Sequence, residues 1–196
     1  MNYREEIEYR NEILARVRNG EKVTSMEQQW LLTHRIYNRS MGYPYLNTDI
    51  IQLQPNINYC VRIKVESMTF DRRILPVITV PGGRGKIVAN SLCSYSNDNV
   101  KSKKIVKMLG ILIDKTHKET EITYQSDLGV LGVSFECEYF DEKQQLIIRK
   151  NSNVGDPNFA MFSETLANNK MIYQCKPPME KDFESFIFSI EWNPIT

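Results

Sequence analysis

Two glutamates between Ser134 and Phe140 come nearest to the spacing of a catalytic pair. Alternation along a strand places Glu136 and Glu138 on one face, about 7 Å apart. That separation lies within the range used in glycoside hydrolysis, where one carboxyl group protonates the leaving group. Catalytic carboxyls usually come from separate elements that flank the substrate, so a solvated strand face is the simpler interpretation. A carboxylate-dependent hydrolase is therefore an alternative function, and whether the chain is an enzyme stays open.

Nucleophilic and metal chemistry has little support in the sequence. A Ser-His or Cys-His arrangement would have to use His34 or His117, the only two histidines, as its base. The sequence contains no G-x-S-x-G elbow, no H-E-x-x-H pair and no D-x-D-x-D-G calcium loop. The four cysteines, at positions 60, 93, 137 and 175, form no C-x-x-C pair, whereas structural zinc sites usually take two ligands from one tight turn. We therefore predict no cofactor and no metal.

Basic residues between positions 84 and 107 could form a site for anions. Arg84 and Lys86 flank a glycine-rich turn whose amides could meet a phosphate, although the residues around it depart from the phosphate-binding loop pattern. The densest basic cluster follows at Lys101, Lys103, Lys104 and Lys107. On a helix these lysines would form one positive flank for phosphates, but a solvated helix face explains them too. Because the net charge of the chain is only +1, a nucleic-acid-binding accessory protein is an alternative that we do not favour.

The loop from Tyr37 to Tyr45, YNRSMGYPY, carries residue types that are enriched at protein interfaces. Its candidate partner-binding residues are Tyr37, Arg39, Tyr43 and Tyr45. Packing of helices onto a sheet explains the tyrosines equally well, and only an exposed cluster would separate the two interpretations. With the catalytic signatures missing, the leading function is a non-catalytic intracellular binding protein of the inhibitor or immunity type. Its expected partner is another protein.

The N-terminal segment is predicted to form two helices. Apolar residues recur near one helical stripe from Tyr3 to Val17, and Asn19-Gly20 supplies a left-handed stop. Thr24 and Glu27 have the spacing of a capping box, which starts a second helix. We expect that helix to end near Asn38, before the proline of the tyrosine-rich loop.

From residue 48 onward the hydrophobic period is that of strands. Alternation is clearest over Asn58–Met68, which has one apolar and one wet side. Ile74–Val80 is predicted at a sheet edge because Pro76 lacks a backbone donor, and the glycine-rich turn after it should make a hairpin with residues 86–90. Further strands are predicted over 111–114, 121–125, 132–140, 145–150 and 170–175. Capping residues and helical spacing predict short inserted helices over 97–110 and 156–169.

The last predicted strand, over 182–193, belongs inside the sheet. It places Phe186, Phe188 and Ile190 on one side and small serines on the other. So much apolar surface fits a sheet interior with cover on both faces. Folding must then wait for the C-terminal residues, so we expect one cooperative domain.

Together these elements predict an α+β fold: an N-terminal helical pair packed on a mostly antiparallel sheet, either a sandwich or an open barrel, with two short inserted helices. Residues 1–47 form the helical segment and residues 48–196 the sheet-rich core. A chain of 196 residues with 41% hydrophobic residues is long enough to bury such a core. We see no signal sequence and no apolar run near the length of about 20 residues that spans a bilayer. We therefore expect a cytoplasmic protein without a membrane partner, and its oligomeric state stays open.

Overall fold

β3, from Asn58 to Met68, is the strand that the sequence predicts most closely. The computed structural model describes residues 2–69, 72–89, 104–111, 118–141, 145–152, 157–178 and 180–195, and it gives β3 the predicted bounds. Val61, Ile63 and Val65 are buried, while the charged residues between them are exposed. The predicted apolar and wet sides are thus confirmed.

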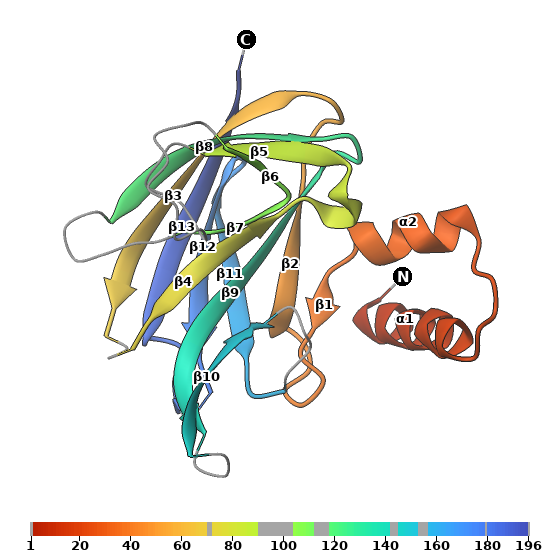
Figure 1. Cartoon of the computed structure of the whole chain (residues 1–196), viewed down its shortest axis with the longest axis horizontal. Coiled ribbons are helices and arrows are strands. Elements are labelled where there is room, and N and C mark those ends of the chain that lie inside the picture. Colours follow the sequence, from red (N-terminus) through yellow and green to blue (C-terminus); the bar gives the residue numbers. More distant parts are fainter. Residues whose placement is uncertain are drawn as a thin grey trace.

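The other strands complete one large antiparallel sheet. They are β1 (Ile36–Tyr37), β2 (Leu46–Gln52), β4 (Ile74–Thr79), β5 (Gly85–Ala89), β6 (Lys104–Val106), β7 (Met108–Gly110), β8 (Glu119–Ser126), β9 (Val130–Asp141), β10 (Leu146–Asn151), β11 (Ala160–Ala167), β12 (Lys170–Lys176) and β13 (Phe186–Pro194). Their order is β6-β5-β8-β3-β13-β12-β11-β2-β9-β4-β7, while β1 pairs with β2 and β10 with β9. The sheet curls into a nearly closed barrel (Figure 1).

A bend at Lys107 joins the two ends of this sheet. β6 pairs with β5 at one end and β7 pairs with β4 at the other, yet only Lys107 separates β6 from β7 along the chain. The carbonyl oxygen of Lys107 accepts a hydrogen bond from the Val80 amide at 2.8 Å. Its Nζ donates a hydrogen bond to the carbonyl oxygen of Gly85. The barrel is therefore closed by a continuous piece of chain that is bonded near both β4 and β5.

The C-terminal strand β13 runs through the middle of the sheet. It lies between β12 and β3, and Phe186, Phe188 and Ile190 are fully buried in the core. The predicted interior position is confirmed. The cover on the outer side is only partial: Ser189 donates a hydrogen bond to Glu66 at 2.8 Å, while Ile187 keeps some exposed surface.

The two N-terminal helices, α1 (Tyr3–Arg18) and α2 (Ser25–Thr33), have the predicted caps. Thr24 Oγ1 accepts a hydrogen bond from the Glu27 amide, and the Glu27 carboxylate accepts one from the Thr24 amide, which completes the capping box. Gly20, with a φ of 77°, supplies the left-handed residue after α1. α2 ends well before Asn38, because the chain is already extended at His34 and enters β1.

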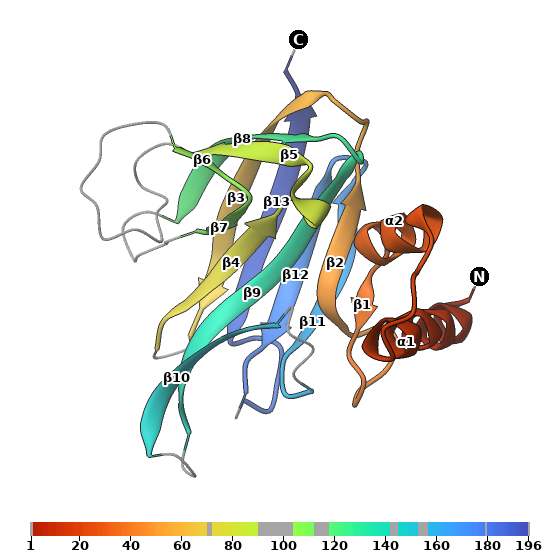
Figure 2. The same cartoon turned by 45° about the vertical axis from the view of Figure 1, so that its right-hand side comes forward.

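The helical pair lies against the outside of the barrel, beside β1 and β2 (Figure 1, Figure 2). The rings of Tyr9 and Trp30 join the two helices edge to face, with centroids 4.9 Å apart. α2 also contacts the short turn η1 (Pro81–Gly83), where a Cβ atom at Gly82 would lie 2.7 Å from Leu32. The helices therefore sit at one side of a mostly β, barrel-like molecule, which corrects the expected helical layer on a sandwich.

The two predicted inserted helices are wrong where the structure describes their residues. Residues 104–106 and 108–110 form β6 and β7, and residues 160–167 form β11. Residues 97–103 and 156 of these predicted helices lie outside the described residues, as do residues 112–114 of the strand predicted over 111–114. β11 pairs with β12 along its length, and such strand pairing overrides a local helical spacing of apolar residues. Consistent with this, Leu166 is exposed while Phe159 is buried.

β4 is not an edge strand, because β9 and β7 pair with its two sides. Its Pro76 is tolerated for a local reason. The carbonyl oxygen of Pro76 accepts a hydrogen bond from the Ile111 amide, just past the end of β7, so the proline nitrogen on the same side meets no β7 partner. The predicted hairpin is also wrong, since β5 pairs with β6 and β8 rather than with β4. At Gly85 a Cβ atom would overlap the carbonyl oxygen of Gln125 in β8.

Candidate functional site

Tyrosine rings from α1, β1 and the following loop form a cluster at the surface, in which Tyr43 is exposed and Tyr3 and Tyr37 are half-buried. The ring centroids of Tyr3 and Tyr43 are 5.3 Å apart, and those of Tyr3 and Tyr37 are 6.1 Å apart. Tyr43 keeps 61% of its surface exposed. Arg39 and Met41 of the same loop are exposed as well. We call Tyr3, Tyr37, Arg39, Met41 and Tyr43 the aromatic face.

Tyr45, which the sequence groups with Tyr37 and Tyr43, packs in a different place. Its ring stacks on Phe183 with centroids 5.0 Å apart and lies 6.4 Å from the ring of Phe162 in β11. This contact joins the end of the loop to the barrel. The tyrosine-rich loop thus contains both a surface cluster and internal packing, the two interpretations that its sequence left open.

Asn38 fixes the loop that carries the aromatic face. Its side chain is completely buried. The Oδ1 atom accepts hydrogen bonds from the amides of Ser40 and Met41 at 2.9 and 2.8 Å, which is the pattern of an Asx turn. The Nδ2 atom donates to the carbonyl oxygen of Phe159 at 2.6 Å. The exposed ring of Tyr43 therefore projects from a loop that is tied to the segment before β11.

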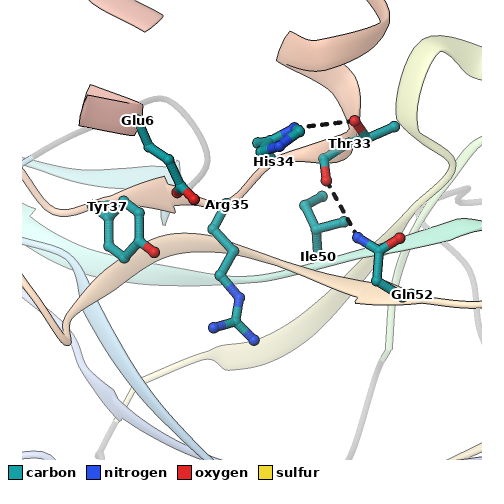
Figure 3. Close-up of a pocket in the computed structure, with 7 residues that line it drawn as sticks. All are labelled: Glu6, Thr33, His34, Arg35, Tyr37, Ile50 and Gln52. Carbon is teal, nitrogen blue, oxygen red and sulfur yellow. Dashed lines mark hydrogen bonds between the residues drawn. The ribbon is translucent and has the colours of Figure 1, made fainter. Parts of the chain in front are cut away.

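A hollow of about 380 Å³ lies between the helical pair and the barrel wall. Its lining consists of Glu6, Thr33, His34, Arg35, Tyr37, Ile50 and Gln52. Figure 3 shows the guanidinium of Arg35 at one end and the ring of His34 at the other. Because Tyr37 also belongs to the aromatic face, the two features are neighbours. The volume is in the range of small-molecule sites.

Arg35 in this hollow contacts a carboxylate that is buried in the barrel. Its Nε lies 2.6 Å from Oδ1 of Asp49, and the two side chains are 43% and 0% exposed. Asp49 also accepts hydrogen bonds from the Ile50 amide at 2.8 Å and the Tyr173 hydroxyl at 3.1 Å. Burial, and then the Asp49 carboxylate, hold the pKa of Tyr173 well above its usual value, so the hydroxyl remains a donor. Burial is the largest single influence and opposes the charge of Arg35, but attraction to Asp49, together with smaller interactions with Tyr37 and Tyr173, raises the pKa of Arg35 on balance.

The remaining walls of the hollow add an imidazole and a second carboxylate. The ring of His34 stacks on Trp30, with centroids 4.2 Å apart, and its Nδ1 lies 2.9 Å from the Trp30 carbonyl oxygen. That contact places the proton of a neutral ring on Nδ1 and leaves Nε2 as an acceptor. Burial, and next the Glu6 carboxylate, raise the pKa of Tyr37. The hollow thus holds cationic, anionic and aromatic groups.

Three of the predicted anion-binding residues come from adjoining parts of the described chain, because Lys107 contacts Gly85, which lies between Arg84 and Lys86 in the sequence. Lys101 and Lys103 lie outside the described residues, and only the backbone of Lys104 is described, in β6. The ammonium group of Lys107 is bonded to Gly85. Arg84 is exposed beside η1, and Lys86 is half-buried in β5. Over residues 104–110, the described part of the helix expected to align the lysines, the chain forms the two short strands β6 and β7.

Glu136 and Glu138 share the face of β9 opposite Cys137, which belongs to the core; Glu136 is nevertheless buried, with 9% of its surface exposed, and Glu138 is half-buried. Each carboxylate has its own arginine: Glu136 pairs with Arg149, and Glu138 lies 3.7 Å from Arg73. These ion pairs account for both glutamates structurally. Among the described residues, no group of three or more His, Cys, Asp or Glu side chains could hold a metal ion.

Arg35 and Asp49 were not predicted from the sequence as site residues. One signal was present, because Asp49 is the only charged residue of LNTDIIQ, the segment that forms β2. A carboxylate inside a buried strand needs a hydrogen-bonding or cationic partner. The identity of that partner follows only from the pairing of β1 with β2, which sequence patterning does not reveal.

Known proteins give no further guide to this site. The chain matches no protein-family model, no curated protein and no solved structure with which it was compared. Within the described ranges, no helix is long and apolar enough to cross a membrane. The function is therefore argued from the geometry.

Proposed function

We propose that this chain is a non-catalytic binding protein of the inhibitor or immunity type and that its partner, another protein, docks on the aromatic face. The observation that carries the proposal is the 61% exposure of Tyr43 within a cluster of tyrosine rings. Tyrosine and arginine are the residue types that dominate the energetics of protein interfaces. A cytosolic location is part of the same proposal, and the absence of disulfides at Cys60, Cys137 and Cys175 agrees with it.

The rigidity of this surface supports a binding role. Rings fixed by a bonded loop lose little conformational freedom when a partner docks, so more of the contact energy appears as affinity. The Asn38 hydrogen bonds provide that fixation. The alternatives have weaker support: Glu136 and Glu138 are each paired with an arginine, and Lys107 is bonded to the backbone.

Quantitative affinity purification from the native host tests the proposal. We expect a partner protein to be recovered with the wild-type chain. With Tyr43→Ala or Arg39→Ala, the recovered amount of that partner should fall by roughly tenfold or more. Leu166→Ala is the matched control, because Leu166 is 55% exposed on β11 outside the aromatic face. Equal recovery with Tyr43→Ala and the wild type, when both are folded, would contradict a partner at this surface.

A further inference from the structure

The hollow contains an arginine whose hydrogen-bonding capacity is only partly used. A guanidinium carries five N–H donors, and Asp49 contacts Arg35 through Nε. No hydrogen bond joins the two Nη atoms of Arg35 to any residue in the described ranges. With the side chain 43% exposed, these donors are open to a ligand.

The buried contact also holds the guanidinium in one orientation. Asp49 cannot turn away, because the Ile50 amide and the Tyr173 hydroxyl both donate to it. An arginine that is fixed along its Nε edge still presents its Nη edge for bidentate binding of a carboxylate. Less rotamer freedom is then lost when a ligand binds.

The rest of the lining sets the character of the ligand. Ile50 is the aliphatic member, and the ring of His34 lies at the end away from the guanidinium (Figure 3). Glu6 adds one negative charge to the wall, which disfavours a ligand with several carboxylates. The Nε2 atom of Gln52 donates a long hydrogen bond, of 3.4 Å, to the Thr33 carbonyl oxygen.

We propose that this hollow binds a small monocarboxylate, whose oxygens accept hydrogen bonds from the Nη atoms of Arg35 and whose short alkyl part lies against Ile50. A volume of about 380 Å³ accommodates such a ligand with room to spare. This site goes beyond the proposed docking of a protein, because its ligand does not contact the exposed ring of Tyr43.

Butyrate is the probe, and NMR titration of the full chain at constant ionic strength is the measurement. We expect saturable shifts of the Ile50 methyl and Arg35 Nε–H signals, with a Kd on the order of 1 mM. Acetate should bind several-fold more weakly, since each methylene buried against Ile50 favours binding by up to about fourfold. Butyramide has the same shape without the charge and should produce no saturable shift, and chloride should produce none either.

Three variants decide where the carboxylate sits. Gln52→Glu adds a negative charge to the lining and should weaken butyrate binding about threefold, whereas Glu6→Gln removes one and should strengthen it by a similar factor. Arg35→Gln should abolish binding. Arg18→Gln is the matched control and should leave the affinity unchanged, because Arg18 is exposed at the end of α1 and outside the lining.

The proposal is overturned if butyramide binds as well as butyrate, if butyrate gives no saturable shift, or if the Glu6→Gln and Gln52→Glu variants bind it alike. The two charge variants leave the Arg35–Asp49 contact in place, so the test stands even where Arg35→Gln fails to fold. Loss of the protein partner in Tyr43→Ala alongside normal butyrate binding would separate the two proposals.

Discussion

Nε of Arg35 lies 2.6 Å from Oδ1 of Asp49, and this contact couples the hollow to the barrel interior. Asp49 has no exposed surface and shares its second oxygen with the Tyr173 hydroxyl. A cation at the surface thus compensates a carboxylate inside. The same guanidinium is placed to support the fold and to meet a ligand.

Removing Arg35 should destabilise the protein, because it leaves the Asp49 carboxylate buried without its cation. We expect Arg35→Gln to lower the free energy of unfolding by about 2 kcal/mol, less than for a fully buried pair because Arg35 is partly exposed. Urea unfolding measures this change. In Arg35→Gln/Asp49→Asn no charge remains buried, so the double variant should lose less than the sum of the single variants; strict additivity would contradict the coupling.

Acid should weaken the junction of α1 and α2 through Glu27. The Arg16 hydrogen bond, followed by that of the Thr24 amide, lowers the pKa of Glu27 from 4.5 to about 2, and Arg16 Nη1 lies 2.6 Å from Oε1. A carboxyl whose pKa falls on folding adds stability above its unfolded pKa, and that stability is lost as the pH drops toward about 2. Hydrogen exchange of the first amides of α2 should accelerate over this interval. Glu27→Gln should remove the pH dependence, and its persistence would point to another group.

Alkali should destabilise the barrel through Tyr124 and Tyr173. Burial raises the pKa of both hydroxyls, and Tyr124 donates to the carbonyl oxygens of Val130 and Thr79 at 2.7 and 3.0 Å. The folded state holds these two protons more tightly than the unfolded state does. The two hydroxyls therefore contribute fully to the free energy of unfolding below the unfolded tyrosine pKa of about 10, and their contribution declines above it. Unfolding free energies measured from about pH 8 to about pH 11 should fall along this curve. In Tyr124→Phe the unfolding free energy should decline less steeply with pH. An unchanged slope would show that Tyr124 does not contribute to the decline.

In the tyrosine-rich loop, we expect Tyr45 to contribute to stability and Tyr43 to contribute to partner binding. We expect Tyr45→Ala to cost about 2 kcal/mol, because it removes the stacking on Phe183. Tyr43→Ala should change the unfolding free energy by less than about 0.5 kcal/mol, because that ring is largely exposed. Thermal or urea unfolding of both variants checks the contrast, and similar losses in the two would contradict it.

Lys107 should contribute to barrel closure rather than to a basic surface. Lys107→Met removes the hydrogen bond to Gly85 and should cost up to about 1 kcal/mol, with faster hydrogen exchange in β5 and β7. Arg84→Met removes a nearby exposed cation and serves as the control, with no change expected in exchange. Equal effects of the two substitutions would indicate a general response to charge.

Local patterns in the sequence predict the elements that carry their own signals. The capping box of Thr24 and Glu27 and the alternation of Val61, Ile63 and Val65 each depend on neighbours along the chain, and both are found. The inserted helices failed because pairing with a distant strand decides the conformation of β11. Pro76 led to the wrong prediction that β4 is an edge strand. The backbone donor that Pro76 lacks would point to the side where β7 ends, so its absence does not prevent pairing on both sides of β4.

The candidate site shows the same division. Tyr37 and Tyr43 were predicted from residue types that are common at interfaces, while Tyr45 of the same loop packs on Phe183. Arg35 lies directly before β1 and Asp49 lies in β2, so their contact depends on the pairing of β1 with β2. Residues nearby in the sequence do not determine which side chains come into contact when two strands pair.

The bend at Lys107 has a consequence for how the molecule resists aggregation. The terminal strands of a sheet are normally where foreign chains attach, and proteins limit this by keeping such strands very short. Here β6 and β7 have three residues each and belong to a single crossing segment. Detaching β6 or β7 from its neighbour in the sheet would disturb the other strand, because the two are joined through Lys107. We therefore expect the two strands to detach together, so that neither is left as a free edge to which another molecule could add a strand.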